Sequence, residues 1–582
     1  MDKLRTVFRV RILLLITLAL AWLVSPPTGA LATTFIPEQP VMPTEELRPG
    51  MKGYMLTVLR GTEPVELPIE VVSVIPQRGP VRHLILTRLL PSEKNSVGGL
   101  AQGMSGSPVY VDGRLIGAIS MGWSFGDHTM AMVMPINDMA RVFSWPDDTG
   151  PGGALMMLGA LKSSPLKVSG LSGRAVTDLQ STLGIPLEAV PFGANGELPL
   201  YEGRFSPGDA ISVFLAWGDV EMSAVGTVTA TSRDGRFLSF GHPFLGRGAV
   251  NFPVARAMIH DTVFSQVFPF KIASPIAMMG TATQDRASGL GGRMGHFTPS
   301  IAASLVFQDM DTGGERVVRN FRVVPDAFLS ARLLAGIYGG LLDQQWGRTG
   351  EGTANVTLRV DGRGIPNGWT RSNVFFSDRD VGSAAVREVA SIIDTIMLQP
   401  FQGIYPIGFR LDVSVTRNPR VLFIEDVVVV PSDAAPGDIL SVEVTLRPWR
   451  RDPIRRSFEI TVPENATGNV ELIVRGGSSN SFSQQALDGG WKSIDNFQRL
   501  LTEINAFDAN NELILELNYD RVARALADGQ SSRAELIQEE REFLSETKAR
   551  RLEEGTLRIS RSEYVIDGFM RRLINLVENT DD

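Results

Sequence analysis

The stretch Gly103-Met104-Ser105-Gly106-Ser107-Pro108 has the residue types and spacing that acyl transfer would need. A nucleophilic serine requires a tight turn, so that its hydroxyl projects while nearby backbone N–H groups converge on the oxyanion formed in the reaction. Glycines on both sides of Ser105 permit that turn. An ordinary turn between two strands can have the same composition, so the stretch alone leaves both interpretations open.

Two β-hairpins would position this chemistry. Each is marked by an Asp-Gly dipeptide, Asp112-Gly113 and Asp234-Gly235, which supplies the positive φ values of a tight hairpin turn. Short apolar runs flank both dipeptides, and we therefore expect two small antiparallel barrels or sandwiches. The predicted strands are 107–111 with 114–119, and 224–231 with 236–240.

The region of Ser105 resembles the trypsin-like serine peptidases, whose nucleophile lies in a Gly-Asp-Ser-Gly-Gly-Pro stretch that leads into a hairpin and a Gly-x-x-Ser-x-Gly strand. In this chain the corresponding strand is Gly117-Ala118-Ile119-Ser120-Met121-Gly122. The resemblance implies that Ser105 is the nucleophile and that the N–H groups of Gly103 and Ser105 form the oxyanion hole. Ser107, which replaces a glycine of the family pattern, is the alternative nucleophile.

Over a longer range, residues 45–139 are similar to the end of the SpoIVB peptidase family domain, and residues from 225 to about 295 resemble its start. In the second region Phe240-Gly241-His242 matches the Gly-His dipeptide of the family's catalytic histidine, which implies that His242 is the general base. The serine half comes first here, whereas it comes second in the family. Unrelated folds use different triad orders, so the permuted order requires only that the two halves pack together. The matching elements of the first region are Arg48-Pro49-Gly50, Leu56-Thr57-Val58, Ile69–Pro76 and Gly98–Pro108.

The orienting acid of a triad is missing from its family position. The family places its aspartate shortly before the serine, where this chain has Arg88-Leu89-Leu90. Glu93 and Asp285 are the remaining candidates, and the sequence assigns neither. Loss of the acid costs about 10⁴ in turnover in the best-studied triad, because the imidazole is no longer held in the correct tautomer. A slow peptidase, a peptidase with a relocated acid and an inactive one all remain open.

The expected fold is mainly β: a trypsin-like double β-barrel module, then a β-sandwich-like domain and a helical C-terminal tail. An amphipathic helix is expected over 386–396, ended by Pro400. A charged helix is expected to begin at the capping pair Ser532 and Glu535 and to run to about Glu554. The expected divisions are a signal peptide over 1–32, the serine-bearing half over 33–146, the histidine-bearing half over 154–300, a β-rich accessory domain with one helix over 301–476, and an α/β to helical C-terminal region over 491–582.

The N-terminus predicts export. Basic residues precede an apolar run over 12–24, and the small-residue pattern Ala30-Leu31-Ala32 follows it, as in a secretory signal peptide. At about 1.5 Å per residue the run spans about 20 Å, short of the roughly 30 Å hydrocarbon core, although an uncleaved anchor remains the alternative. We therefore expect a periplasmic or extracellular protein of the bacterial cell envelope that has no membrane segment after signal removal.

Composition narrows the chemistry further. The chain has no cysteine, which excludes disulfides, a cysteine nucleophile and thiolate metal sites. A formal charge of -8 offers no basic footprint for nucleic acid. No zinc-binding His-Glu-x-x-His or phosphate-binding loop motif occurs, and no cofactor or metal is expected.

Two functions from different classes follow. The first is a serine endopeptidase of SpoIVB type, in which Ser105 attacks a peptide carbonyl of a protein substrate, the chain itself included, and His242 accepts the proton. The second is a catalytically impaired envelope scaffold that keeps the double barrel as a protein-binding surface. A short distance between Ser105 Oγ and a ring nitrogen of His242 would favour the enzyme.

Overall fold

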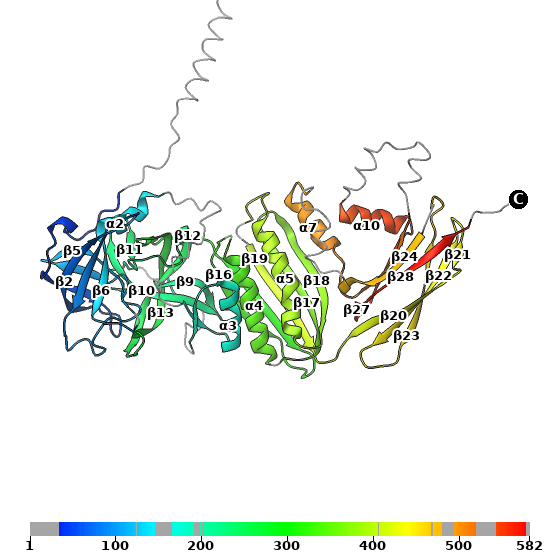
Figure 1. Cartoon of the computed structure of the whole chain (residues 1–582), viewed down its shortest axis with the longest axis horizontal. Helices are drawn as coiled ribbons and strands as arrows, with labels where there is room; N and C mark the ends of the chain where they lie inside the picture. The colour runs from blue at the N-terminus through cyan, green and yellow to red at the C-terminus, as the bar shows by residue number, and fades with distance from the viewer. Residues whose placement is uncertain are drawn as a thin grey trace, which may run out of the picture.

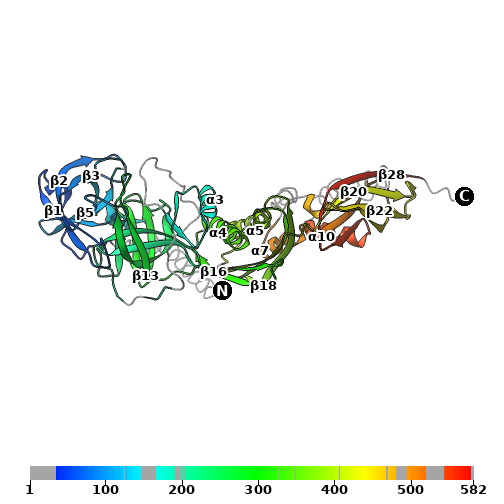
Figure 2. The same cartoon turned by 90° about the horizontal axis from the view of Figure 1, so that it is seen from below.

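The computed structural model describes residues 34–145, 166–190, 198–200, 203–466, 470–479, 494–519 and 543–577, apart from residues 124, 327, 348, 405 and 406. The described chain is mainly β and elongated, with its parts in sequence order along the long axis (Figure 1). Two barrels lie at one end, a helix-covered sheet lies in the middle and a β-sandwich lies at the other end, as the view from below also shows (Figure 2).

The first barrel carries the serine. Its six strands close in the order β1-β2-β3-β6-β5-β4. The predicted hairpin is confirmed, because β4 and β5 pair antiparallel across Asp112 and Gly113, both of which have positive φ. The bounds are η1 (Thr44–Glu46), β1 (Lys52–Thr57), β2 (Val65–Pro76), β3 (His83–Leu89), β4 (Pro108–Val111), β5 (Arg114–Met121), β6 (Met130–Pro135), α2 (Ile136–Ala140) and η2 (Arg141–Ser144).

The second barrel carries the histidine. Strands β9 to β14 form a ring, because β9 pairs with both β12 and β10 while β13, β14 and β11 complete the circuit. The predicted hairpin across Asp234-Gly235 is confirmed as β10 and β11. The bounds are β9 (Ala210–Gly218), β10 (Glu221–Thr231), β11 (Arg236–Ser239), β12 (Gly248–Val263), β13 (Phe270–Arg286) and β14 (Gly289–Met294).

The middle layer continues the second barrel, since β16 pairs with the C-terminal end of β9, beyond the residues that pair with β12, and extends one sheet to thirteen strands. Two helices cover the middle strands, whereas the sequence predicts only one helix over 301–476. The expected helix is α5, and the missed one is α4, which is buried along most of its length and therefore lacks a clear polar face. The bounds are β7 (Leu166–Ser169), α3 (Gly173–Leu183), β8 (Leu187–Ala189), β15 (Ile301–Asp309), β16 (Val317–Val323), α4 (Ser330–Trp346), β17 (Gly352–Gly362), β18 (Ile365–Ser377), α5 (Val381–Leu398) and β19 (Ile407–Thr416).

The sandwich draws strands from both sides of residue 476. Its four-stranded sheet β23-β22-β20-β27 faces the five-stranded sheet β21-β28-β24-β25-β26 across a shared apolar core. The C-terminal region is therefore more than a helical tail, because three of its strands, β25, β27 and β28, contribute residues to this core. The bounds are β20 (Val421–Val430), β21 (Asp433–Ala434), β22 (Ile439–Pro448), β23 (Ile454–Thr461), β24 (Val470–Gly476), η3 (Gly477–Ser479), α7 (Phe497–Ala506), β25 (Glu512–Asn518), α10 (Leu544–Glu553), β26 (Leu557–Arg561), β27 (Val565–Asp567) and β28 (Phe569–Leu576).

Some expectations concern residues that the structure does not describe. The signal segment over 1–32 and the capping pair Ser532 and Glu535 lie outside the described residues, although α10 ends at Glu553, close to the predicted end of that helix. Among the described helices, none is both long and apolar enough to cross a membrane.

Candidate active site

The serine loop, residues 101–107, is a compact turn that leads into β4. Met104 is fully buried in the core of the first barrel, and its carbonyl accepts a hydrogen bond from the N–H of Ser107 (3.0 Å). Gly103 and Gly106 have φ values of 93° and 91°, in the region that favours glycine. Positive φ values therefore explain the glycines around Ser105, as expected if this loop is the tight turn of a nucleophilic serine.

The serine loop is bound to the second barrel through β10. The N–H of Thr227 donates to Ser105 O (2.8 Å), and its hydroxyl donates to Gly103 O (2.9 Å). The hydroxyl of Thr229 donates to Gly106 O (2.7 Å), and both threonine side chains are completely buried. Sequence reasoning missed these two residues. The signal that could have found them is the alternation of threonines in an otherwise apolar strand, Val225-Gly226-Thr227-Val228-Thr229.

The histidine lies on a turn that meets the serine loop. Phe240 and Gly241, directly before His242, both have positive φ (67° and 65°), which is strained for the bulky Phe240. The N–H of Gly106 donates to Ile119 O (2.7 Å), and a Cβ added to Gly241 would lie 2.9 Å from that same oxygen. The structure therefore brings the serine loop and the histidine turn together at one carbonyl of β5.

The imidazole of His242 is held in one tautomer. Its Nδ1 lies 2.7 Å from Pro243 O, and a carbonyl oxygen only accepts, so Nδ1 carries the proton and Nε2 has a free lone pair. Burial lowers the pKa of His242 from its ordinary value, against the opposing effect of the hydrogen bond to Pro243. A neutral imidazole with a bare Nε2 is the form that a general base needs.

Neither candidate acid reaches this imidazole. Asp285 is completely buried, and its carboxylate accepts from the N–H groups of Phe244 (2.7 Å), Leu245 (2.8 Å) and Arg247 (3.2 Å). It therefore positions the loop that follows His242. Burial raises the pKa of Asp285, while these backbone hydrogen bonds act in the opposite direction. Glu93 is exposed in the segment between β3 and the serine loop.

The backbone N–H groups of Gly103 and Ser105 are free donors. The carbonyl of Gln102 accepts from the N–H of Lys271 (3.1 Å), and that of Met104 accepts from Ser107. In a trans peptide the N–H points away from the C=O, so these bonds direct the two N–H groups to the opposite side. Neither has an acceptor among the described residues, as an oxyanion hole requires.

The serine hydroxyl itself is buried in this structure. Ser105 Oγ has no hydrogen-bond partner among the described residues, and so it makes no bond to His242. The same holds for the hydroxyls of Ser107 and Ser120, which lie on the segments beside it. The candidate nucleophile and the candidate base therefore lie on segments that meet at Ile119 O, and no hydrogen bond joins the two side chains in this structure.

The tip of the β12–β13 hairpin binds the serine loop and the segment that follows β5. Pro269 O accepts from the N–H of Gln102 (2.7 Å), and Val267 O accepts from the N–H of Phe125 (3.1 Å). The ring of Phe268 lies close to Gly122, since a Cβ added there would be 3.2 Å from the ring. Strands of 16 and 17 residues give this hairpin the reach to cross from its own barrel to the other.

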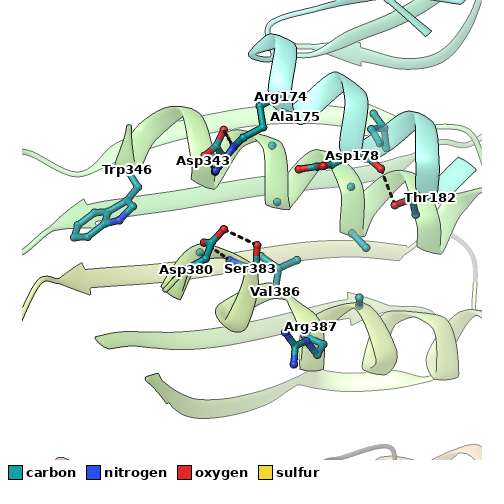
Figure 3. Close-up of a pocket in the computed structure, with 17 residues that line it drawn as sticks. Arg174, Ala175, Asp178, Thr182, Asp343, Trp346, Asp380, Ser383, Val386 and Arg387 are labelled. Atoms are coloured by element: carbon teal, nitrogen blue, oxygen red, sulfur yellow. Dashed lines mark hydrogen bonds and ion pairs between the residues drawn. The ribbon is translucent and has the colours of Figure 1, made fainter. Parts of the chain in front are cut away.

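A separate cavity of 340 Å³ lies between α3, α4 and α5 (Figure 3). Its lining includes Gly339 of α4, where an added Cβ would meet nothing within 4 Å. Three of its charged lining residues serve the helices themselves: Arg174 pairs with Asp343, and Asp380 caps α5 through Ser383. None of the candidate catalytic residues lines this cavity.

The comparisons with known proteins support the resemblance of the first barrel to the SpoIVB peptidase family. Residues 31–128 match the family model of SpoIVB peptidase S55, a range that includes β1 to β5 and Ser105 but ends before His242. Searches of characterised proteins and of solved structures find no match to the chain. Residues 31–128, the segment that holds the candidate nucleophile, are therefore similar to the SpoIVB peptidase family.

Proposed function

We propose that the chain is an exported serine endopeptidase that cleaves a protein substrate, the chain itself included, with Ser105 as nucleophile and His242 as general base. The observation that carries this proposal is the meeting of the serine loop and the histidine turn at Ile119 O. These two segments come from different barrels, and a fold without catalytic use for them has no need to bring the His242 turn, strained at Phe240, to the glycine-flanked loop of Ser105.

The proposed reaction follows from the groups in place. Nε2 of His242 takes the proton of Ser105 as Oγ attacks the peptide carbonyl, and the N–H groups of Gly103 and Ser105 stabilise the oxyanion. His242 then returns the proton to the leaving amine, and water hydrolyses the acyl-enzyme by the same route. The carbonyl of Pro243 supports the tautomer of His242, the task that a carboxylate performs in the common triad.

The proposal is tested by labelling the purified protein with a fluorophosphonate probe across a range of pH. We expect labelling that is lost in His242→Ala and that rises with pH through a midpoint below about 6.5, because the lowered pKa of His242 keeps the imidazole neutral above that value. A folded wild-type protein that does not label at any pH would contradict the proposal.

A non-catalytic protein-binding module is the second candidate, and two observations favour it. Ser105 Oγ is buried and has no partner, and no carboxylate among the described residues is bound to His242. The same labelling experiment separates the two functions, since a binding module has no activated serine.

In the proposed enzyme, the tip of the β12–β13 hairpin must release the serine loop before a substrate carbonyl can reach the buried Oγ. We expect Phe268→Ala to increase the labelling rate several-fold, because it removes the ring that packs beside Gly122. Phe264→Ala is the matched control, since Phe264 lies on the same hairpin tip and is 66% exposed. Slower labelling of a folded Phe268→Ala protein would show instead that the ring supports the active arrangement.

A further inference from the structure

Lys271, the second residue of β13, is buried beneath the serine loop. It is 1% exposed, and its Nζ donates to Thr57 Oγ1 (2.8 Å) and to Gly103 O (3.2 Å). Among the described residues no carboxylate forms an ion pair with it. A buried ammonium without a counter-charge costs stability, and an apolar side chain of the same length would fill the space at lower cost. The lysine therefore calls for a reason beyond packing.

The contacts of Lys271 fix two successive peptide groups of the serine loop. Its backbone N–H binds Gln102 O (3.1 Å), while its Nζ shares Gly103 O with the hydroxyl of Thr227. The methylene stem lies directly against Gly103, where an added Cβ would be 3.1 Å from Lys271 Cδ. These bonds hold the carbonyls of Gln102 and Gly103 on the side of Lys271, so that the N–H of Gly103 points to the opposite side of the loop.

We propose that Lys271 is a positioning residue of the peptidase site, which holds the oxyanion loop in place through a charged hydrogen bond to Gly103 O. The inference rests on the proposed function of Ser105 and His242. A hydrogen bond from a charged donor is roughly twice as strong as a neutral one, so the protonated amine holds Gly103 O more firmly than the neutral amine would.

The charge of Lys271 titrates near neutral pH. Burial lowers the pKa of its ammonium group to about 7. The titratable groups on the strands that pack against it are Lys167 of β7, which donates to Lys271 O (2.7 Å), and His260 and Asp261 of β12, and none of them bonds to Lys271 Nζ. The ammonium is present below this pKa and is lost as pH rises through it. Activity that depends on the charge should therefore fall above about pH 7.

The test compares fluorophosphonate labelling rates across pH for wild type, Lys271→Met and Thr57→Val. For Lys271→Met we expect labelling to be at least about tenfold slower, a smaller loss than the roughly 10²–10³ cost of losing a direct oxyanion donor. The fall in labelling rate above about pH 7, the alkaline limb of the profile, should be absent from this variant. Its thermal stability should be equal to or higher than that of wild type, because a buried charge is removed. Lys167→Met, which removes a neighbouring lysine that does not touch the serine loop, should behave as wild type.

Thr57→Val provides a second, gentler variant. It removes one hydrogen-bond acceptor of the Lys271 ammonium, which disfavours the charged form and lowers the pKa of Lys271. The alkaline limb should therefore move to lower pH. An unchanged limb in Thr57→Val, or wild-type rates in Lys271→Met, would overturn the inference while leaving the proposed function standing. Labelling that rises through pH 7 and survives in His242→Ala would make Lys271 the base and would also overturn it. A folded wild type that never labels would overturn the proposed function and this inference together.

Discussion

Ser105→Ala is expected to abolish fluorophosphonate labelling and peptide hydrolysis, because the atom that forms the covalent bond is removed. Loss of the nucleophile in a serine peptidase costs on the order of 10⁶ in turnover. The variant should fold normally, since Ser105 Oγ makes no hydrogen bond with the described residues and its removal leaves no partner unsatisfied. The measurement is the rate of labelling, together with mass spectrometry of the modified peptide.

Ser107→Ala is the matched control for this prediction. Ser107 lies two residues away on the same loop, and its hydroxyl is also buried and without a partner among the described residues. We expect labelling close to that of wild type and a stability that is unchanged or slightly raised. Loss of labelling in Ser107→Ala but not in Ser105→Ala would transfer the role of nucleophile to Ser107, and equal loss in both would undermine the assignment of Ser105.

Gly106→Ala should destroy the site by separating the two barrels. An added Cβ would lie 2.0 Å from Thr227 O and 2.4 Å from Phe240 N, both of which are backbone atoms. The substitution also places a non-glycine residue at a φ of 91°. We expect destabilisation of at least about 2 kcal/mol, at the upper end of ordinary single substitutions, and loss of labelling. Thermal unfolding and labelling measure the two effects.

Gly113→Ala isolates the backbone strain from the steric clash. Gly113 lies in the β4–β5 hairpin with a φ of 71°, and nothing lies within 4 Å of its added Cβ. Its substitution should cost about 1–2 kcal/mol and leave labelling in place. If Gly106→Ala were no more harmful than Gly113→Ala, the close docking of the serine loop on β10 would not be required for the site.

Local sequence rules predict the hairpins and the turn well. An Asp-Gly dipeptide determines its hairpin because the positive φ values are a property of two residues, and both predicted hairpins form. The glycines around Ser105 are likewise explained by φ values within the loop. Helix α4 is not predicted because it is buried along most of its length. It therefore lacks the polar face whose periodic spacing identifies an amphipathic helix in a sequence.

The sequence does not predict which residues far apart along the chain contact one another. The sequence identifies Ser105 and His242 only through resemblance, and it contains no information on whether their halves pack together. The structure brings their loops to one carbonyl of β5, through threonines of β10 whose pattern is that of any alternating strand. It also binds the carboxylate of Asp285 to backbone N–H groups, and it buries Lys271 beneath the serine loop.

The sequence by itself determined the β-rich character of the chain, the positions of its tight turns and the type of chemistry that Ser105 could support. Those features depend on residues that are adjacent or periodic along the chain. Only the tertiary structure decided which barrel faces which loop, which donors remain free and which buried groups adjoin Ser105. These properties arise from contacts between residues far apart in the sequence, and one pair, Lys271 Nζ and Gly103 O, joins positions 168 residues apart.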